Sequence, residues 1–126
     1  MRRTFYVATS FTNRAQAQEV ADYLQDKGLR WVYGHNWTLE EHAPPGDPKT
    51  ALLMLRDLQS AVGADIFVLL LKSPLTIGAH VELGARLGVN KEAHLVLQGT
   101  IAWHPFHDHP GIVKHHDLDS FINMVL

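Results

Sequence analysis

The apolar run from Ile66 to Leu71 constrains the fold of this 126-residue chain more than any other segment. Six apolar residues follow one another with no polar residue between them, and Asp65 and Lys72 flank the run. A strand with one face in water alternates apolar and polar residues, whereas helices cover both faces of a parallel sheet. The run therefore predicts a central strand of a parallel α/β sheet.

Strand-like and helix-like segments alternate along the rest of the chain. Short apolar segments at 4–8, 29–33, 93–97 and 112–113 predict four further strands. Apolar residues at helical spacing predict helices after residue 13, after Asp47, from Gly78 to Leu87 and after Asp117. We expect one domain over residues 1–126, a three-layer α/β sandwich with a five-stranded parallel sheet of flavodoxin or Rossmann type.

Composition excludes several classes of function. Eleven Lys and Arg against 13 Asp and Glu give a formal net charge of −2, so the chain lacks the basic surface that binds nucleic acid. No cysteine is present, which excludes disulfides, thiolate metal ligands and a cysteine nucleophile. The first apolar segment is too short for a signal peptide, and no run reaches the 18 apolar residues of a membrane span. We expect a cytoplasmic protein with no nucleic-acid or membrane partner.

A glutamate follows the central strand where ligands bind in parallel α/β sheets. The helix predicted to open at Gly78 carries Glu82 in its first turn or so, just beyond the carboxyl end of that strand. Gly78 permits close backbone approach, and a helix N-terminus favours a negative group. We therefore expect Glu82 to be ionised and to face a cleft. The alternative is that Glu82 only interacts favourably with the helix dipole.

Four local features resemble the nucleoside 2-deoxyribosyltransferase family and its relatives, the deoxynucleoside 5′-monophosphate N-glycosidases. They are a tyrosine in the opening strand (Tyr6), a hydroxyl residue in the first turn (Ser10), the pair Ala64-Asp65 before the central strand, and the sequence Glu82-Leu83-Gly84. The likeness is sharpest between Ala64 and Lys91. The turn before the glutamate departs from the pattern, because His80 stands where the phosphate-reading branch usually has glycine.

The resemblance implies roles for these positions. Glu82 would be the nucleophile that attacks C1′ of the sugar, with Tyr6 beside it and Asp65 associated with the base. Ser10 and Thr76 match by position the residues that hold a 5′-phosphate. The resemblance also implies a homodimer or larger homo-oligomer. We expect no cofactor.

The chemistry of glycosidic cleavage suits these residue types. A carboxylate close to the anomeric carbon can bond to it or stabilise its positive charge, and a phenol can orient that carboxylate. Departure of the base is easier when the base is protonated or hydrogen-bonded, a role open to Asp65 or His80. The structural alternative for Asp65 is that it only bonds backbone amides at the start of its strand.

Two further residues are candidates for substrate binding. Trp37 lies in the long polar loop from Gly34 to Asp47, where its indole can stack on a nucleobase or simply pack on the sheet. Arg14 opens the first helix, where it can pair with a phosphate beside Ser10 or remain a solvated surface residue.

Nine histidines are many for this length. Five of them gather near the C-terminus: His104, His107, His109, His115 and His116. Imidazoles beside Asp108 are suitable zinc ligands. Their spacing nevertheless matches no helical i, i+4 ligand pair, and prolines at 105 and 110 indicate an irregular loop. We predict no physiological metal site.

The leading hypothesis is an enzyme, a transferase or hydrolase, that cleaves or exchanges the N-glycosidic bond of a nucleoside or its 5′-monophosphate. One alternative is a nucleotide-binding or sensing module without turnover. A weaker alternative is a glycohydrolase of a nicotinamide dinucleotide, since other small parallel α/β domains also use a glutamate against a ribosyl bond.

Overall fold

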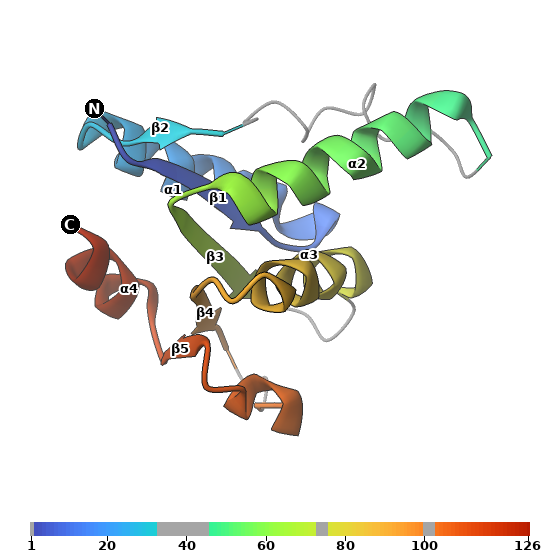
Figure 1. Cartoon of the computed structure of the whole chain (residues 1–126). Coiled ribbons are helices and arrows are strands. Elements are labelled where there is room, and N and C mark those ends of the chain that lie inside the picture. Colours follow the sequence, from blue (N-terminus) through green and yellow to red (C-terminus); the bar gives the residue numbers. More distant parts are fainter. Residues whose placement is uncertain (1, 33–45, 73–75, 100–102) are drawn as a thin grey trace.

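The computed structural model describes residues 2–32, 46–72, 76–99 and 103–126. At its centre lies a parallel five-stranded sheet in the order β2-β1-β3-β4-β5 (Figure 1). The strands are β1 (Thr4–Ala8), β2 (Arg30–Trp31), β3 (Ile66–Leu71), β4 (Ala93–Leu97) and β5 (Ile112–His115). The predicted fold class is therefore confirmed.

Helices cover both faces of this sheet (Figure 1). They are α1 (Arg14–Asp26), α2 (Pro48–Gly63), α3 (Ile77–Gly88) and α4 (Leu118–Val125), with short 3-10 helices η1 (Phe11–Asn13) and η3 (Pro105–Asp108). Residues of α1 and α4 pack on one face, and residues of α2 and α3 pack on the other. No helix in the described segments is long and apolar enough to cross a bilayer.

The central strand has the environment that its sequence predicts. Strand β3 pairs with β1 on one side and β4 on the other, and all six of its residues are buried. Side chains alternate between the two apolar clusters along each strand, because successive residues of a strand point to opposite faces. In β1, Phe5 and Val7 belong to the cluster under α1 and α4, whereas Tyr6 belongs to the cluster under α2 and α3.

Helix starts and stops follow the predicted signals. The Asp47 carboxylate accepts a hydrogen bond of 2.9 Å from the backbone N–H of Lys49, and Pro48 occupies the first position of α2. At the start of α4, Asp117 accepts a bond of 2.8 Å from the N–H of Ser120. Gly28 has a φ of +94°, a left-handed conformation that ends α1 at low cost.

Two expectations were less accurate. The second strand is only Arg30–Trp31, shorter than the predicted 29–33. In α2 the buried residues are Ser60 and Ala61, whereas Leu55 of the predicted apolar stripe is 56% exposed. The opening turns of α2 project beyond the strands in Figure 1, so the sheet covers only its last turns.

A buried arginine joins α3 to the end of α2. The Arg86 guanidinium is 3% exposed and donates to the carbonyls of Glu92 at 2.9 Å and Ala61 at 3.1 Å. It also donates to the carbonyl of Ala64, just after α2. Carbonyls at a helix C-terminus lack partners within the helix. Arg86 satisfies them and fixes the two helices side by side.

Candidate active site

The sheet order places a topological switch point between β1 and β3. The strands are adjacent, with Ala8 paired to Leu69, but α1 leaves β1 on one face and α3 leaves β3 on the other. Ligands of open parallel sheets bind at such a switch point, beyond the carboxyl ends of the strands. Residues of the β1–α1 and β3–α3 connections are therefore the first candidates for a site.

Tyr6 and Glu82 meet on the face of the sheet that α2 and α3 cover. The Tyr6 side chain is 2% exposed, and its ring stacks on Phe67 with 6.0 Å between centroids. Its hydroxyl donates a hydrogen bond to Oε2 of Glu82, which α3 carries over the same face of the sheet. Strand β1 thus supplies a donor to one oxygen of the Glu82 carboxyl group.

The electrostatic state of Glu82 differs from the expectation. Glu82 is the sixth residue of α3, so it lies in the second turn, and the helix dipole acts mainly within the first. Burial raises the pKa of Glu82 to about 8, against an opposing contribution from the Tyr6 hydrogen bond. The predicted ionised Glu82 is therefore corrected: in the free protein this carboxyl is mostly protonated at pH 7.

Asp57 of α2 is a functional candidate that the sequence did not single out. Its negative charge contributes to the raised pKa of Glu82, so the two carboxyl groups interact across the facing helices. The sequence alone carried no signal for this role, because the burial of Ser60 and Ala61, which marks the sheet-facing side of α2, is known only from the structure. Asp57 precedes the buried Ser60 and Ala61 by three and four residues, which puts it on the sheet-facing side of the helix.

Asp65 does not join this site. Its Oδ2 accepts hydrogen bonds from Thr4, at 2.8 Å from the backbone N–H and 3.2 Å from the hydroxyl. The N–H of Asp65 in turn donates to Thr4 Oγ1 at 3.0 Å. These bonds lower the pKa of Asp65 and tie the starts of β1 and β3 together. Asp65 lies at the amino edge of the sheet and makes the backbone contacts that the structural alternative for this residue predicts.

Ser10 and Arg14 flank the turn after β1. Ser10 is half-buried and its hydroxyl lies 3.2 Å from that of Thr12. Arg14 is exposed, donates to the Phe11 carbonyl at 3.0 Å, and its guanidinium carbon lies 4.1 Å from the centre of the Phe11 ring. Ser10 therefore lies just beyond the carboxyl end of β1, as predicted. The Arg14 side chain contacts the carbonyl and the ring of Phe11.

Thr76, Gly78 and His80 lie at the start of α3. Thr76 is the N-cap residue and is 3% exposed, but its hydroxyl bonds to His80 Nδ1 at 2.7 Å and does not cap the helix. His80 continues to His107 of η3, with 3.0 Å between the two Nε2 atoms. Gly78 is exposed, and a Cβ added there would meet no atom within 4 Å. Trp37 lies outside the described residues.

The histidines form pairs. His94 and His115 repeat the arrangement of His80 and His107, with 3.0 Å between His94 Nδ1 and His115 Nε2. Burial lowers the pKa of His94 to about 4 and also lowers that of His115. Over the described segments, no three His, Asp or Glu side chains come together as metal ligands.

A surface groove lies on the opposite face of the sheet from Glu82. It runs between α1 and α4 and is lined by Gln16, Tyr23, Ile122 and Asn123, among others. Helices α1 and α4 pack against the cluster that contains Val7, so this groove does not approach the side chain of Tyr6.

Comparisons with known proteins bear on the fold. The structure is similar to that of the CMP N-glycosidase BcmB from Clostridium botulinum, with a TM-score of 0.68 over 98% of each chain and 12% sequence identity. No protein-family model matches the sequence, and no curated protein matches it either. At this identity the likeness establishes a shared fold.

Proposed function

We propose that this chain cleaves the N-glycosidic bond of a nucleoside 5′-monophosphate, with Glu82 as the nucleophile. The observation that carries the proposal is the hydrogen bond from the Tyr6 hydroxyl to Glu82 on the face of the sheet that α2 and α3 cover. The fold shared with a CMP N-glycosidase supports the same class of reaction. The features that resemble nucleoside 2-deoxyribosyltransferases agree with both.

The reaction proceeds in two balanced steps. An oxygen of ionised Glu82 bonds to C1′ while the bond from C1′ to the base nitrogen breaks and its electron pair leaves with the base. A proton reaches the departing base from Asp57, the second carboxyl group near Glu82. Water then attacks C1′, the ester bond to Glu82 breaks, and the water proton returns to Asp57. A second base in place of water gives exchange.

The raised pKa of Glu82 sets a condition on the first step. A protonated carboxyl is a poor nucleophile, so the proton must leave Glu82 before attack. The Tyr6 hydroxyl assists, because its hydrogen bond stabilises the carboxylate. Glu82 and Asp57 thus form a pair of interacting carboxyl groups in which the proton rests on Glu82 in the free protein. In the proposed reaction this proton moves to Asp57, which leaves Glu82 ionised as the nucleophile and Asp57 protonated as the acid.

The remaining candidates contact the substrate in this proposal. Ser10 and Thr76, which follow the adjacent strands β1 and β3, bind the 5′-phosphate. The open space at Gly78 lets the sugar approach the first turn of α3. Arg14 and Trp37 are proposed contacts for the phosphate and the base. Asp65 is left out because it lies at the other edge of the sheet.

The experiment is a base-release assay. The protein is incubated with nucleoside and deoxynucleoside 5′-monophosphates and their parent nucleosides, with and without acceptor bases, and products are separated by chromatography. We expect release or exchange of base that Glu82→Gln abolishes and that Glu19→Gln, an exposed change on α1, leaves unchanged. Absence of turnover with every substrate contradicts the proposal.

One observation favours a second function, nucleotide binding without turnover. A carboxyl group that is mostly protonated at pH 7 can hydrogen-bond a ligand without attacking it. This alternative predicts that a nucleotide raises the Tm of the protein while no product forms, and that the shift persists in Glu82→Gln.

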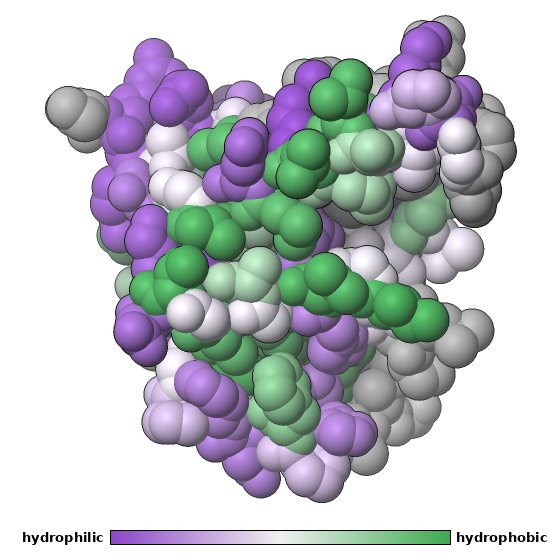
Figure 2. Space-filling model, turned by 45° about the vertical axis from the view of Figure 1, so that its right-hand side comes forward, coloured by the Kyte–Doolittle hydropathy of each residue, from purple (hydrophilic) through white to green (hydrophobic). Residues whose placement is uncertain are grey.

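We infer in addition that the chain assembles as a homodimer or larger homo-oligomer. Large apolar residues of α2 and α3 are exposed, among them Leu52 at 68%, Ile77 at 81% and Val81 at 55%. Figure 2 shows hydrophobic surface gathered over these two helices. An apolar patch of this kind is typical of a protein–protein contact. A second copy of the chain would cover it, beside the helices that carry Asp57 and Glu82.

A further inference from the structure

A pair of histidines links the start of α3 to the segment after β4. Nε2 of His80 lies 3.0 Å from Nε2 of His107, and the two rings stack with 5.3 Å between centroids. His80 belongs to α3 and His107 to η3, 27 residues apart in the chain. Neither residue takes part in the two steps of the proposed reaction, although His80 adjoins Thr76.

The hydrogen bonds around His107 fix which of its nitrogens carries the proton. Nδ1 of His107 lies 3.0 Å from the backbone nitrogen of His104, and that N–H can only donate. Nδ1 of neutral His107 must therefore accept, so the ring proton sits on Nε2. That proton points at Nε2 of His80, which accepts it.

His80 must then carry its own proton on Nδ1. This nitrogen lies 3.0 Å from the carbonyl oxygen of Thr76 and 2.7 Å from its hydroxyl oxygen. Both oxygens accept from the single N–H. The Thr76 hydroxyl proton is therefore not used by His80, and in the described part of the chain His80 is the sole partner of this hydroxyl. Thr76 is left with a donor to offer.

We propose that His107 and His80 are positioning residues that hold the Thr76 hydroxyl as a hydrogen-bond donor for an acceptor atom of the substrate, such as a phosphoryl oxygen. The proposal rests on the proposed function, because Thr76 is its phosphate contact. Thr76 itself is 3% exposed, while Gly78, two residues later, is exposed and would accept a Cβ without contact within 4 Å. The opposite tautomer of His80 would make Thr76 donate to Nδ1 and present only lone pairs, which repel a phosphate.

The same proton order argues against a metal ion at this pair. A metal would need lone pairs on both Nε2 atoms. Neutral His107 would then carry its proton on Nδ1, facing the backbone N–H of His104 at 3.0 Å. That arrangement sets two donors against each other.

This arrangement of ring protons, with His80 protonated on Nδ1 and His107 on Nε2, requires both rings to be neutral. A second proton on His80 would set its Nε2–H against the Nε2–H of His107. A second proton on His107 would set its Nδ1–H against the backbone N–H of His104. The charged or titratable groups acting on His107 within the described segments are His80, His104, Lys114 and Asp108, and Lys114 bonds to Asp108. Burial, together with His80, His104 and Lys114, lowers the pKa of His107, which favours the neutral form of this ring at pH 7.

The first test reads the tautomers directly in the free protein. Long-range ¹H–¹⁵N spectra of protein labelled at histidine distinguish an Nδ1–H ring from an Nε2–H ring. At pH 7.5 we expect His80 as Nδ1–H and His107 as Nε2–H, with signals assigned from His80→Gln and His107→Gln. An Nε2–H tautomer at His80 overturns the proposal whether or not the protein is an enzyme.

The second test separates positioning from structure. His107→Phe keeps a stacked ring but loses both polar contacts, whereas His107→Gln can donate to His80 Nε2 and accept from the N–H of His104. The exposed His116→Gln is the control. For cytidine 5′-monophosphate we expect His107→Phe to raise KM on the order of tenfold with little change in kcat, and His107→Gln to restore the value. Cytidine should show no such change.

Three outcomes are decisive. Equal losses for cytidine and its monophosphate in His107→Phe, or no loss for either, overturn the proposal. The expected loss confined to the monophosphate supports it. If the wild-type protein neither binds nor cleaves cytidine 5′-monophosphate or any other nucleotide, the proposed function fails and Thr76 is no ligand donor, while the tautomer spectra still decide the proton order.

Discussion

The hydroxyl of Tyr6 in β1 donates a hydrogen bond to the Glu82 carboxyl in α3, across 76 positions of the chain. The bond couples a strand that has a neighbour on each side to a helix that lies over it. It also opposes the effect of burial on the carboxyl pKa. The protonation state of Glu82 therefore depends on Tyr6 and Asp57, and each can be changed separately.

Tyr6→Phe should shift the pH dependence of activity to higher pH. The hydroxyl stabilises the carboxylate, so its removal raises the pKa of Glu82 further above 8. The ring can still stack on Phe67, which keeps the fold. We expect the rising limb of kcat/KM against pH to move upward, and activity at pH 7 to fall on the order of tenfold for every pH unit that the limb moves. An unchanged limb contradicts the assignment of Glu82 as the titrating group.

Asp57→Asn should move the rising limb of kcat/KM to lower pH. The negative charge of Asp57 contributes to the raised pKa of Glu82, so a neutral amide lowers that pKa. If Asp57 also protonates the leaving base, kcat falls on the order of 100-fold or more for substrates with poor leaving groups. Rates are compared for a natural nucleotide and for one with an activated leaving group. A variant with wild-type rates on both would exclude Asp57 as the acid.

Glu82→Gln should change how stability depends on pH. The native state keeps the Glu82 proton up to pH about 8, whereas an unfolded chain releases it near the ordinary pKa of 4.5. The native state thus binds more protons in this window, and the stabilising contribution present below pH 4.5 is lost as pH rises to about 8. Glutamine does not titrate. Urea unfolding should show the variant gaining stability relative to wild type from about pH 5 to about pH 8, a trend that Glu19→Gln should lack.

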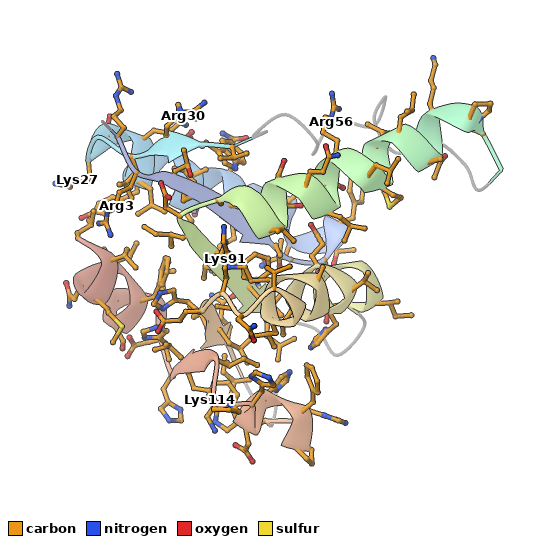
Figure 3. The ribbon with its side chains drawn as sticks, viewed as in Figure 1. Arg3, Lys27, Arg30, Arg56, Lys91 and Lys114 are labelled. Atoms are coloured by element: carbon orange, nitrogen blue, oxygen red, sulfur yellow. The ribbon has the colours of Figure 1, made fainter. Side chains whose placement is uncertain are left out.

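Arg86→Met should destabilise the fold. The change leaves the carbonyls of Ala61, Ala64 and Glu92 without their donor. Buried acceptors without partners cost about 1–3 kcal/mol each, so we expect a loss of about 3 kcal/mol or more in urea unfolding. Arg30→Met is the matched control, since Arg30 is exposed on the edge strand, as its side chain shows in Figure 3. Equal effects of the two changes would mean that Arg86 has no special structural role.

Leu52→Lys should reduce assembly. Leu52 is 68% exposed on α2, and a charge there opposes burial against a second copy. Light scattering at micromolar concentration should give a smaller mass for this variant than for wild type. Met124→Lys on α4 places a charge at a residue that is 60% exposed on the other face and should keep the wild-type mass. A monomeric wild-type protein would contradict the assembly proposal.

Much of the fold was predictable because its signals are local. The run from Ile66 to Leu71 and the caps at Asp47 and Asp117 each depend on a few neighbouring residues. The apolar residues at helical spacing in α2 suggested a buried side that the structure does not show. Helical spacing indicates that one side of a helix is apolar but not what covers that side. Leu55 is exposed where the helix projects past the sheet.

The site was predictable only in part. Resemblance selected Tyr6 and Glu82, and the structure brings them together. The resemblance also selected Asp65, although the length of β3 indicates that this residue lies far from the start of α3. Six residues of strand span about 20 Å, so a residue before β3 and the start of the helix after it lie at opposite edges of the sheet. Asp57 acts on Glu82 through two packed helices, a relationship that no spacing along the chain reveals.

The division of the interior by the sheet has a practical consequence for engineering. Tyr6 faces the α2 and α3 side, while its neighbours Phe5 and Val7 face α1 and α4. Redesign of the layer under α1 and α4, for instance to raise heat tolerance, should leave substrate preference intact. Libraries aimed at new substrates can then begin with the residues packed around Tyr6 and Glu82.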